Sequence, residues 1–270
     1  MASADISTST VRERFRSLHQ TDAIFVMPNP WDVGSAKLLE RMGFAALATT
    51  SSGLAASLGK NDQHLTRTEL VDHVRTMTAA IGVPLNVDAE RCYSETLAGI
   101  AETVELLADA GASGCSIEDY DPAASGIDEL NRAVDRVAAA ATAAHANGML
   151  LTARAEAHLY GNADIGDTID RLIAFGDAGA DCLYAPGLVD LGEIRRVVEI
   201  GVPVNVLVFA DGPGVGDLES VGVRRVSTGG ALAWAAYGGL VRAAQELLDA
   251  GTSTYAFDGL SKTHRHAFDG

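Results

Sequence analysis

Short apolar segments alternate along this chain with longer segments whose apolar residues have helical spacing. In one longer segment, Leu97, Ile100 and Val104 recur at intervals of three and four residues, as on one face of a helix. The short segments are almost continuously apolar, which is typical of parallel strands covered on both faces. They predict eight strands, at residues 24–30, 46–52, 84–90, 114–119, 150–156, 180–186, 203–209 and 224–229.

The regular alternation predicts an α/β fold, a (β/α)8 TIM barrel made by one domain that spans residues 1–270. Glycines such as Gly111 and Gly179 stand just before a strand, where they end the preceding helix in a left-handed conformation. A doubly wound open sheet is the alternative fold. No Gly-x-Gly-x-x-Gly motif opens an early helix, so a dinucleotide-binding sheet has little support.

The two ends of the chain differ from the repeated units. Residues 10–19 predict a helix that covers the bottom of the barrel, whereas the polar tail at 252–270 has no clear period. We expect the tail either to be disordered or to pack on a neighbouring subunit. The N-terminal residues have no basic region followed by an apolar core, so no secretion signal is expected.

Composition narrows the classes of partner. The chain has 20 Lys and Arg against 36 Asp and Glu, a net charge of -16, which argues against nucleic acid and anionic membranes as partners. No apolar run approaches the length of a membrane span. The three cysteines, Cys92, Cys115 and Cys182, are too few and odd in number for a disulfide framework. We therefore expect a cytoplasmic protein with reduced thiols.

Acidic residues follow three consecutive predicted strands. Asp62 lies on the loop after the second strand, Asp88 and Glu90 end the third, and Glu118 ends the fourth. Asp88 and Glu90 are two residues apart, so their side chains point the same way if the strand stays regular. Such carboxylates would repel one another at one end of a barrel unless a cation compensates them. They predict a hydrated Mg²⁺ or Mn²⁺ ion.

A cation and a backbone loop could hold an anion close to these carboxylates. Arg154 ends the fifth predicted strand, and its guanidinium can hold a carboxylate or phosphonate through two hydrogen bonds. A structural ion pair of Arg154 with Glu156 or Glu118 is the alternative. The Ser52-Gly53-Leu54 segment after the second strand can offer backbone N–H groups to a carboxylate. Together these groups describe a site for a 2-oxo or 2-hydroxy acid.

Eight stretches of the chain, between about Phe25 and Gly251, together resemble the isocitrate lyase/phosphoenolpyruvate mutase superfamily. The resemblance implies a barrel that often exchanges its last helix between subunits of a homodimer or homotetramer. It also implies Mg²⁺ and the cleavage or formation of C–C or P–C bonds next to a 2-oxo acid. The stretches are Asn29–Ala36, Thr50–Leu54, Asp88–Glu90, Ile117–Asp119, Thr152–Arg154, Ala185–Gly187, Pro203–Val206 and Arg225–Gly229.

The resemblance also implies roles for individual residues. Asp88 matches the direct metal ligand, and Arg154 matches the arginine that clamps the substrate, with Glu118 beside it in the catalytic group. The water-bridged acidic shell around the metal corresponds to Asp62, Glu90 and Glu118. The remaining substrate-binding positions are Trp31, Ser52, Gly53, Leu54 and Asn205.

Two departures from the superfamily pattern bear on the reaction. The Lys-Lys/Arg-Cys-Gly-His loop of the lyases is missing, and the connection after Glu118 is too short for the gating loop of the mutases. Cys92 could replace the lyase cysteine as an acid, but a buried packing role is favoured. The leading hypothesis is an Mg²⁺-dependent lyase that cleaves a C–C bond in a small 2-oxo or 2-hydroxy carboxylate. The alternatives are a P–C bond enzyme and a non-catalytic 2-oxo acid binding protein.

Overall fold

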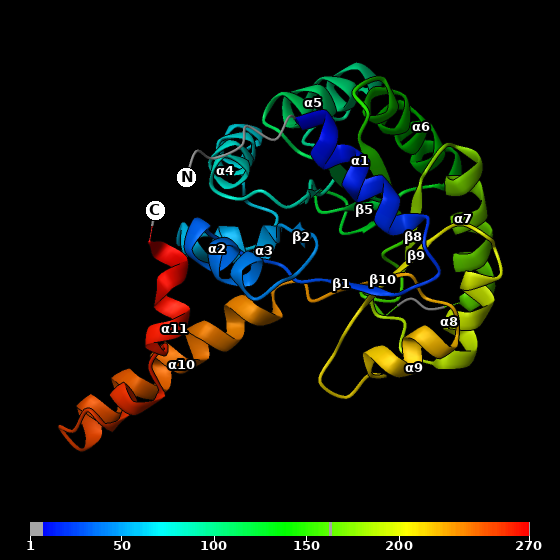
Figure 1. The fold of residues 1–270 in the computed structure, drawn as a ribbon. Helices are drawn as coiled ribbons and strands as arrows, with labels where there is room; N and C mark the ends of the chain where they lie inside the picture. Colours follow the sequence, from blue (N-terminus) through cyan, green and yellow to red (C-terminus); the bar gives the residue numbers. More distant parts are fainter. Residues whose placement is uncertain (1–7, 162–163, 270) are drawn as a thin grey trace.

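Eight parallel strands curve into a nearly closed barrel in this computed structural model, which describes residues 8–161 and 164–269 (Figure 1). The edge strands β1 and β2 are joined where the Ala48 N–H donates to the Pro28 carbonyl at 3.1 Å. The order around the barrel is β1-β10-β9-β8-β7-β4-β3-β2. The prediction of a (β/α)8 barrel is confirmed. The strands are β1 (Phe25–Met27), β2 (Leu47–Ala48), β3 (Leu85–Asp88), β4 (Gly114–Glu118), β7 (Leu150–Arg154), β8 (Cys182–Tyr184), β9 (Val204–Leu207) and β10 (Arg225–Ser227).

Helices follow the strands and surround the barrel, as Figure 1 shows for α4 to α8. In the part of the chain that is described, no helix is both long and apolar enough to cross a membrane. The helices are α2 (Val33–Arg41), α3 (Ser51–Ser57), α4 (Arg67–Ala80), α5 (Leu97–Asp109), α6 (Leu130–Ala146), α7 (Ile165–Asp177), α8 (Leu191–Val198), α9 (Val215–Ser220) and α10 (Ala231–Asp249).

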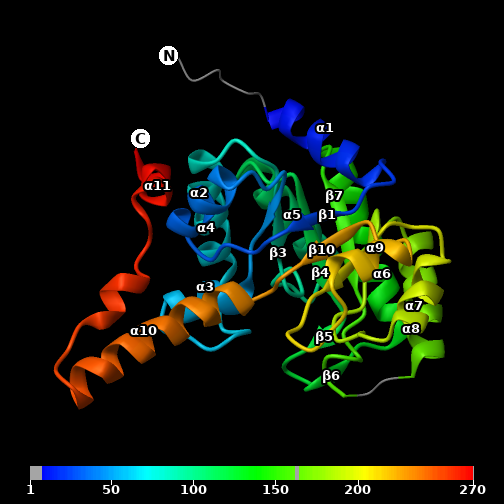
Figure 2. The same ribbon diagram turned by 60° about the horizontal axis from the view of Figure 1, so that its bottom comes forward.

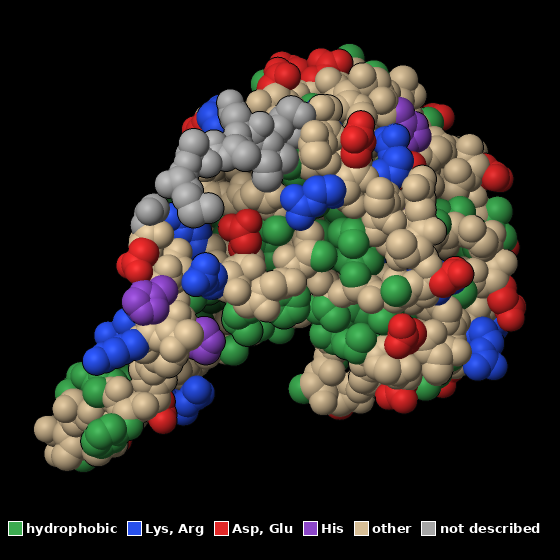
Figure 3. All heavy atoms as spheres, in the orientation of Figure 1, with side chains coloured by type: hydrophobic (Ala, Val, Ile, Leu, Met, Phe, Trp, Pro, Cys, Tyr) green, Lys and Arg blue, Asp and Glu red, His purple; other side chains and the backbone are tan. Residues whose placement is uncertain are grey.

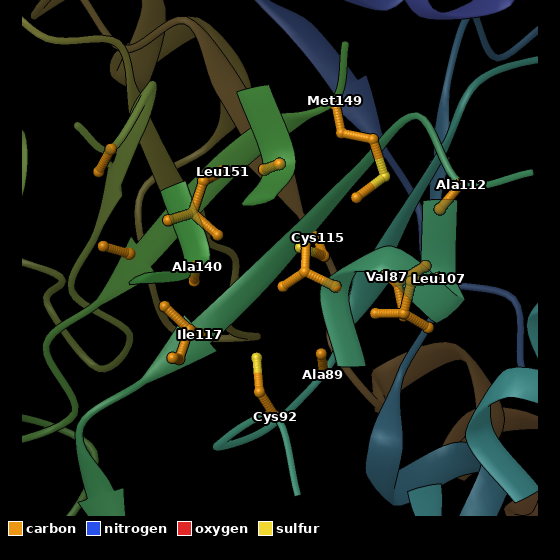
Figure 4. Packing of buried hydrophobic residues seen from close by; sticks show 14 of the residues in the cluster. Val87, Ala89, Cys92, Leu107, Ala112, Cys115, Ile117, Ala140, Met149 and Leu151 are labelled. Carbon is orange, nitrogen blue, oxygen red and sulfur yellow. The ribbon is translucent and has the colours of Figure 1, made fainter. Parts of the chain in front are cut away.

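Alternation along each strand separates a helix-facing core from a polar barrel interior. On β3 and β4, Val87, Cys115 and Ile117 point outward and pack against helix residues such as Leu107 and Ala140 (Figure 4). The intervening residues face the interior, because successive strand side chains point to opposite faces. The polar interior positions of β3, β4 and β7 are Asn86, Asp88, Ser116, Glu118, Thr152 and Arg154.

The predicted N-terminal helix is present as α1 (Thr8–His19). It lies at the opposite end of the barrel from the hairpin of β5 (Tyr120–Asp121) and β6 (Gly126–Ile127), as Figure 2 shows. Phe15 of α1 is fully buried in a small cluster with Met27 and Leu150. The helix therefore seals the bottom of the barrel, and the strand ends at the other face remain available for a site.

The second strand is shorter than predicted. Residues 46–52 predict one strand, but β2 ends at Ala48 and α3 begins at Ser51. Thr50 caps this helix by accepting a hydrogen bond from the Gly53 N–H at 3.3 Å, so the chain turns into a helix within the apolar run. The β5–β6 hairpin was also not predicted, because its strands have two residues each.

The last helix leaves the barrel. Figure 1 shows α10 running outward, followed by the tail that turns back toward α2. Leu240, Val241 and Leu248 of α10 are 64%, 65% and 81% exposed. The tail forms η1 (Thr254–Asp258), α11 (Lys262–Arg265) and η2 (His266–Phe268), and η2 contacts α2. The tail thus forms short helical turns and contacts α2 of its own chain, and its packing on a neighbouring subunit stays a prediction.

Candidate active site

A cavity of about 160 Å³ opens at the carboxyl ends of the strands. Its wall combines acidic residues, two arginines and small polar side chains, as expected where the inward-facing residues of a TIM barrel reach the catalytic face. Of the predicted site residues, those that line the cavity are Ser52, Asp62, Asp88, Arg154 and Asn205.

Arg154 joins three carboxylates at this cavity. Its Nη1 lies 2.7 Å from Asp88 Oδ1, its Nη2 lies 3.3 Å from Glu118 Oε2, and its Nε lies 2.7 Å from Glu156 Oε1. The side chains of Glu118 and Glu156 are 3% and 1% exposed. The guanidinium carbon also lies 5.3 Å from the ring centroid of Tyr184. The ion pairs with Glu156 and Glu118 that the sequence left open therefore both form, and Asp88 is a third partner.

Burial and the neighbouring carboxylates shift the pKa of Arg154 in opposite directions. Burial would lower the pKa of Arg154, but the charges of Glu156, Glu118 and Asp88 outweigh it and raise that pKa well above its usual value. Burial raises the pKa of Glu118 well above its usual range, although Arg154 opposes this. The pKa of Glu156 is raised for the same reason. Three carboxyl groups therefore share one guanidinium, and burial makes Glu118 and Glu156 hold a proton more readily than free carboxyl groups do.

Asp88 is held rigidly at the cavity wall. Its Oδ2 accepts a hydrogen bond from the Ser51 N–H at 3.0 Å, and its own N–H donates to Thr49 Oγ1 at 2.9 Å. Asp62 lines the same cavity, and its pKa is raised by partial burial and then by the charge of Asp88, although much of the residue is exposed. These two carboxylates thus line one cavity, and their role as metal ligands stays a prediction.

Glu90 is not among the residues that line this cavity, although the charges of Asp88 and Asp62 act on it, and its place in the water-bridged shell stays a prediction. Regular strand geometry ends at Asp88, and Glu90 has a left-handed φ of 46° that turns its side chain out of the alternation. Glu90 lines a neighbouring cleft instead, and its Oε1 is buried without a hydrogen-bond partner. Burial, followed by the charges of Asp88 and Asp62, raises the pKa of Glu90 to about 8.

The predicted carboxylate cradle lies at the start of α3. Ser52 lines the cavity, whereas Gly53 and Leu54 are buried and their N–H groups donate to Thr50. A Cβ on Gly53 would lie 2.7 Å from Thr50 Cγ2 and 2.9 Å from Cβ of Trp31. Glycine is thus required here for close packing, and Trp31 lies beside α3 rather than among the residues that line the cavity. The anion-binding role of this segment stays a prediction.

Asn205 lines the cavity, but its amide is engaged within the barrel. Its Oδ1 accepts from Arg225 Nε at 2.9 Å, and its Nδ2 donates to Ser227 Oγ at 2.9 Å. Arg225 is a cavity residue that the sequence reasoning missed. An arginine inside an apolar strand was the available signal, because such a residue must either face a polar interior or leave the sheet.

The short connection after Glu118 forms the β5–β6 hairpin. Tyr120 of β5 stacks on Tyr160, with ring centroids 3.7 Å apart. Asp128 after β6 is paired with Arg91 and with Arg132 of α6. The arginine pairs hold the hairpin in place, and the shortening of this loop relative to the superfamily stays a prediction.

Gln63 is a second site residue that the sequence reasoning did not find. Its Nε2 donates to Glu118 Oε1 at 2.9 Å, from a backbone with a φ of 63°. A left-handed conformation in a residue other than glycine costs on the order of 1 kcal/mol and is concentrated at functional sites. Glutamine on a loop gives no sequence signal of such a contact.

Cys92 is a packing residue. It is fully buried, and burial raises the pKa of its thiol to about 12. Figure 4 shows it in the core beside Ala89 and Ile117. The thiol does not line the cavity, and its raised pKa makes it a poor proton donor, so the packing role is favoured over the acid role.

The donor set suits a hydrated cation better than a fully protein-bound one. No three acidic, histidine or cysteine side chains in residues 8–161 and 164–269 converge closely enough to hold a metal by themselves. However, Asp88 and Asp62 share the cavity, and Glu90 beside it has an Oε1 without a hydrogen-bond partner and a pKa raised by burial and then by the charges of Asp88 and Asp62. Mg²⁺ keeps several waters and needs as few as one or two direct carboxylates, so these residues fit it.

Comparison with known proteins assigns the family. The family model described as phosphoenolpyruvate phosphomutase matches residues 15–248. The chain belongs to the phosphoenolpyruvate phosphomutase family. The resemblance to the isocitrate lyase/phosphoenolpyruvate mutase superfamily is confirmed, and the protein is an enzyme of this group of lyases and mutases.

Relatives within the family differ in their reactions. Oxaloacetate decarboxylase of Paraburkholderia xenovorans is 31% identical over 86% of this chain and 77% of its own length. 2-Methylisocitrate lyase of Salmonella typhimurium is also 31% identical, over 66% of this chain and 64% of its own. A crystal structure from Burkholderia cenocepacia J2315, named as a lyase/mutase, is 43% identical with a TM-score of 0.93, covering 97% of this chain and 98% of that chain.

Proposed function

We propose that this protein is an Mg²⁺- or Mn²⁺-dependent lyase that cleaves a C–C bond in a small 2-oxo or 2-hydroxy carboxylate. The observation that carries the proposal is the single guanidinium of Arg154, set among Asp88, Glu118 and Glu156 at the cavity. Three carboxyl groups around one guanidinium can rearrange to admit a divalent ion together with an anionic substrate. The relatives that act as decarboxylase and lyase support the same reaction class.

The chain's own residues would bind the substrate and orient it. Arg154 would exchange part of its contact with Asp88 or Glu118 for a bidentate contact with a substrate carboxylate, because guanidinium matches that geometry. Tyr184 would hold the guanidinium plane from one side, at its present 5.3 Å. Gln63 would keep Glu118 in place during this exchange, through its 2.9 Å hydrogen bond.

Asp88, with Asp62 beside it, would hold the cation in the cavity. A bound divalent cation supplies Lewis-acid stabilisation of the negative charge that develops on the substrate oxygen. The electron pair of the broken C–C bond stays on the carbon next to the carbonyl, which gives an enolate that then takes up a proton. The stacked pair Tyr120 and Tyr160 would limit the access of water to that carbanion-like product.

A P–C bond reaction is the second candidate, because the matching family model is that of phosphoenolpyruvate phosphomutase. Such a reaction also needs a guanidinium and a cation next to a 2-oxo acid. The short hairpin between Asp119 and Leu130 leaves little chain to enclose a transferring phosphoryl group. We therefore rank C–C cleavage first.

We also propose that the enzyme works as a homodimer or homotetramer in which α10 packs on a second copy. Trp234, Leu240, Val241 and Leu248 of this helix are more than half exposed. Figure 3 shows apolar side chains at the hollow between the α10 arm and the body of the molecule. Sedimentation equilibrium of the full chain tests this, and a monomer at micromolar concentration would contradict it.

Turnover of an acid panel tests the proposed reaction. Purified protein is incubated with oxaloacetate, 2-methylisocitrate, other 2-oxo and 2-hydroxy acids and phosphonopyruvate, with Mg²⁺ or with EDTA, and products are followed by NMR. We expect C–C cleavage of at least one acid with Mg²⁺ and none with EDTA. Turnover of phosphonopyruvate alone would replace the first candidate by the second, and no turnover of any acid would refute both.

A further inference from the structure

Arg225 is a buried cation without an anionic partner. The residue is 2% exposed, and among the described residues no carboxylate lies within ion-pair distance of its guanidinium. Its partners are neutral: Asn205 Oδ1 at 2.9 Å, Thr152 Oγ1 at 2.8 Å and His19 Nε2 at 3.2 Å. A buried unpaired charge is costly, and neutral acceptors compensate it incompletely.

His19 stays neutral in this arrangement. Burial, followed by the charge of Arg225, lowers its pKa to about 3. Its Nδ1 lies 2.9 Å from the Phe15 carbonyl and therefore carries the proton, which leaves Nε2 free to accept from Arg225. These three contacts use three of the five guanidinium N–H groups, so two N–H groups have no acceptor among them.

The guanidinium of Arg225 lies one layer below the acidic groups. Thr152 precedes Arg154 by two residues on β7, which places it roughly 6.6 Å deeper in the barrel at a strand rise of about 3.3 Å per residue. Arg225 reaches Thr152, and both line the cavity that Asp88 and Arg154 also line. One cavity thus has an acidic layer above and a cationic layer below.

The lower layer is otherwise neutral and polar. Asn86 and Ser116 stand two residues before Asp88 and Glu118, and both line the cavity. No acidic residue of this layer competes for Arg225. A four-carbon diacid has terminal oxygens roughly 6 Å apart when extended, which is comparable to the spacing of the two layers.

We propose that Arg225 forms a second anion-binding subsite that takes the remote carboxylate of a diacid substrate. The inference rests on the proposed function, because the other end of the acid would lie at Asp88 and Arg154. A carboxylate on Arg225 would accept hydrogen bonds from the two remaining N–H groups and neutralise the buried charge. The remote carboxylate would be retained during the reaction, since a cation that stabilises a carboxylate in the ground state opposes its loss as neutral CO₂.

Binding of two matched acids tests this subsite. Malate and 2-hydroxybutyrate share a four-carbon chain and a 2-hydroxy acid head, and differ by a carboxylate in place of a methyl group. Isothermal titration with Mg²⁺ and with EDTA gives the affinity ratio for the wild type, Arg225→Gln and Arg225→Lys. We expect the wild type to prefer malate at least tenfold, Arg225→Gln to lose this preference, and Arg225→Lys to keep part of it.

Arg224→Gln is the matched control, because Arg224 points outward to Asp22 at 2.9 Å. It should keep the full preference for malate. Equal affinity of the wild type for the two acids, or a preference that survives in Arg225→Gln, overturns the proposal. Absence of turnover with every acid would refute the proposed function but would leave this binding ratio unchanged.

A crystal structure of the wild type with malate needs no variant and so remains decisive if Arg225→Gln fails to fold. One malate carboxylate within hydrogen-bond distance of Arg225 supports the subsite. The subsite is overturned if both malate carboxylates lie at Arg154 and the strand ends. It is also overturned if an inorganic anion such as chloride occupies Arg225 while malate binds elsewhere.

Discussion

Glu90→Gln should stabilise the metal-free protein, increasingly so as the pH rises. Burial and the charges of Asp88 and Asp62 raise the pKa of Glu90 from 4.5 to about 8, and its Oε1 has no hydrogen-bond partner. The folded state therefore favours the protonated form, which glutamine imitates. The folded-state pKa lies above the unfolded value, so stability is complete below pH 4.5 and falls as the pH rises toward 8.

The size of this stabilisation follows from the difference between the pKa values of Glu90 in the folded and unfolded states. At 1.36 kcal/mol per pKa unit, Glu90→Gln should be more stable than the wild type by about 1 kcal/mol at pH 5 and about 3 kcal/mol at pH 7. The gain should level off at about 4–5 kcal/mol above pH 8. Urea unfolding in EDTA between pH 5 and pH 9 measures the free energies.

Glu105→Gln makes the same chemical change at an exposed position on α5 and should leave the free energy of unfolding nearly constant. Repeating the unfolding measurement with Mg²⁺ gives a second test, because a bound cation stabilises ionised Glu90. The advantage of Glu90→Gln at pH 8 should shrink when Mg²⁺ replaces EDTA. A stability difference that does not change with pH would refute the reasoning, as would a variant less stable than the wild type at every pH.

Three further substitutions separate binding, packing and chemistry. Arg154→Lys should raise KM by about 10–100-fold, because lysine cannot make the paired contact; steady-state kinetics with an unaltered KM would count against the clamp. Gly53→Ala should lower the free energy of unfolding by about 1–3 kcal/mol, since its Cβ would overlap Thr50 and Trp31; a neutral result in urea unfolding would contradict the packing account. Cys92→Ala should cost about 1–2 kcal/mol yet keep kcat, and a loss of kcat in the folded variant would restore the thiol as an acid.

The fold was predictable because one physical pattern repeats eight times. Buried strands such as Gly114–Glu118 need apolar residues on the face that packs against the helices, and the helices between the strands need helical spacing. The end of β2 was not predictable from apolarity, since Thr49 to Ala56 suits either a strand or a helix. The N-cap at Thr50 favours the helix over a continued strand.

The site was predictable where a strand fixes the direction of a side chain. Asp88 and Arg154 lie at regular strand ends and meet at 2.7 Å. Glu90 does not line this cavity because a left-handed φ follows the strand, and no glycine marks that turn. Gln63 contacts Glu118, 55 positions away in the sequence, and a glutamine on a loop gives no local signal of such a pairing. Arg225 contacts Thr152, 73 positions away; its place within a predicted strand indicated a polar interior but not this partner.

Binding of Mn²⁺, followed by electron paramagnetic resonance, tests the central claim most directly. The account predicts one Mn²⁺ per chain in the wild type, lost in Asp88→Asn and retained in Asp72→Asn, whose side chain is 64% exposed on α4. A wild type that binds no Mn²⁺, or an Asp88→Asn variant that binds it with unchanged affinity, would contradict a metal-dependent site at Asp88 and Arg154.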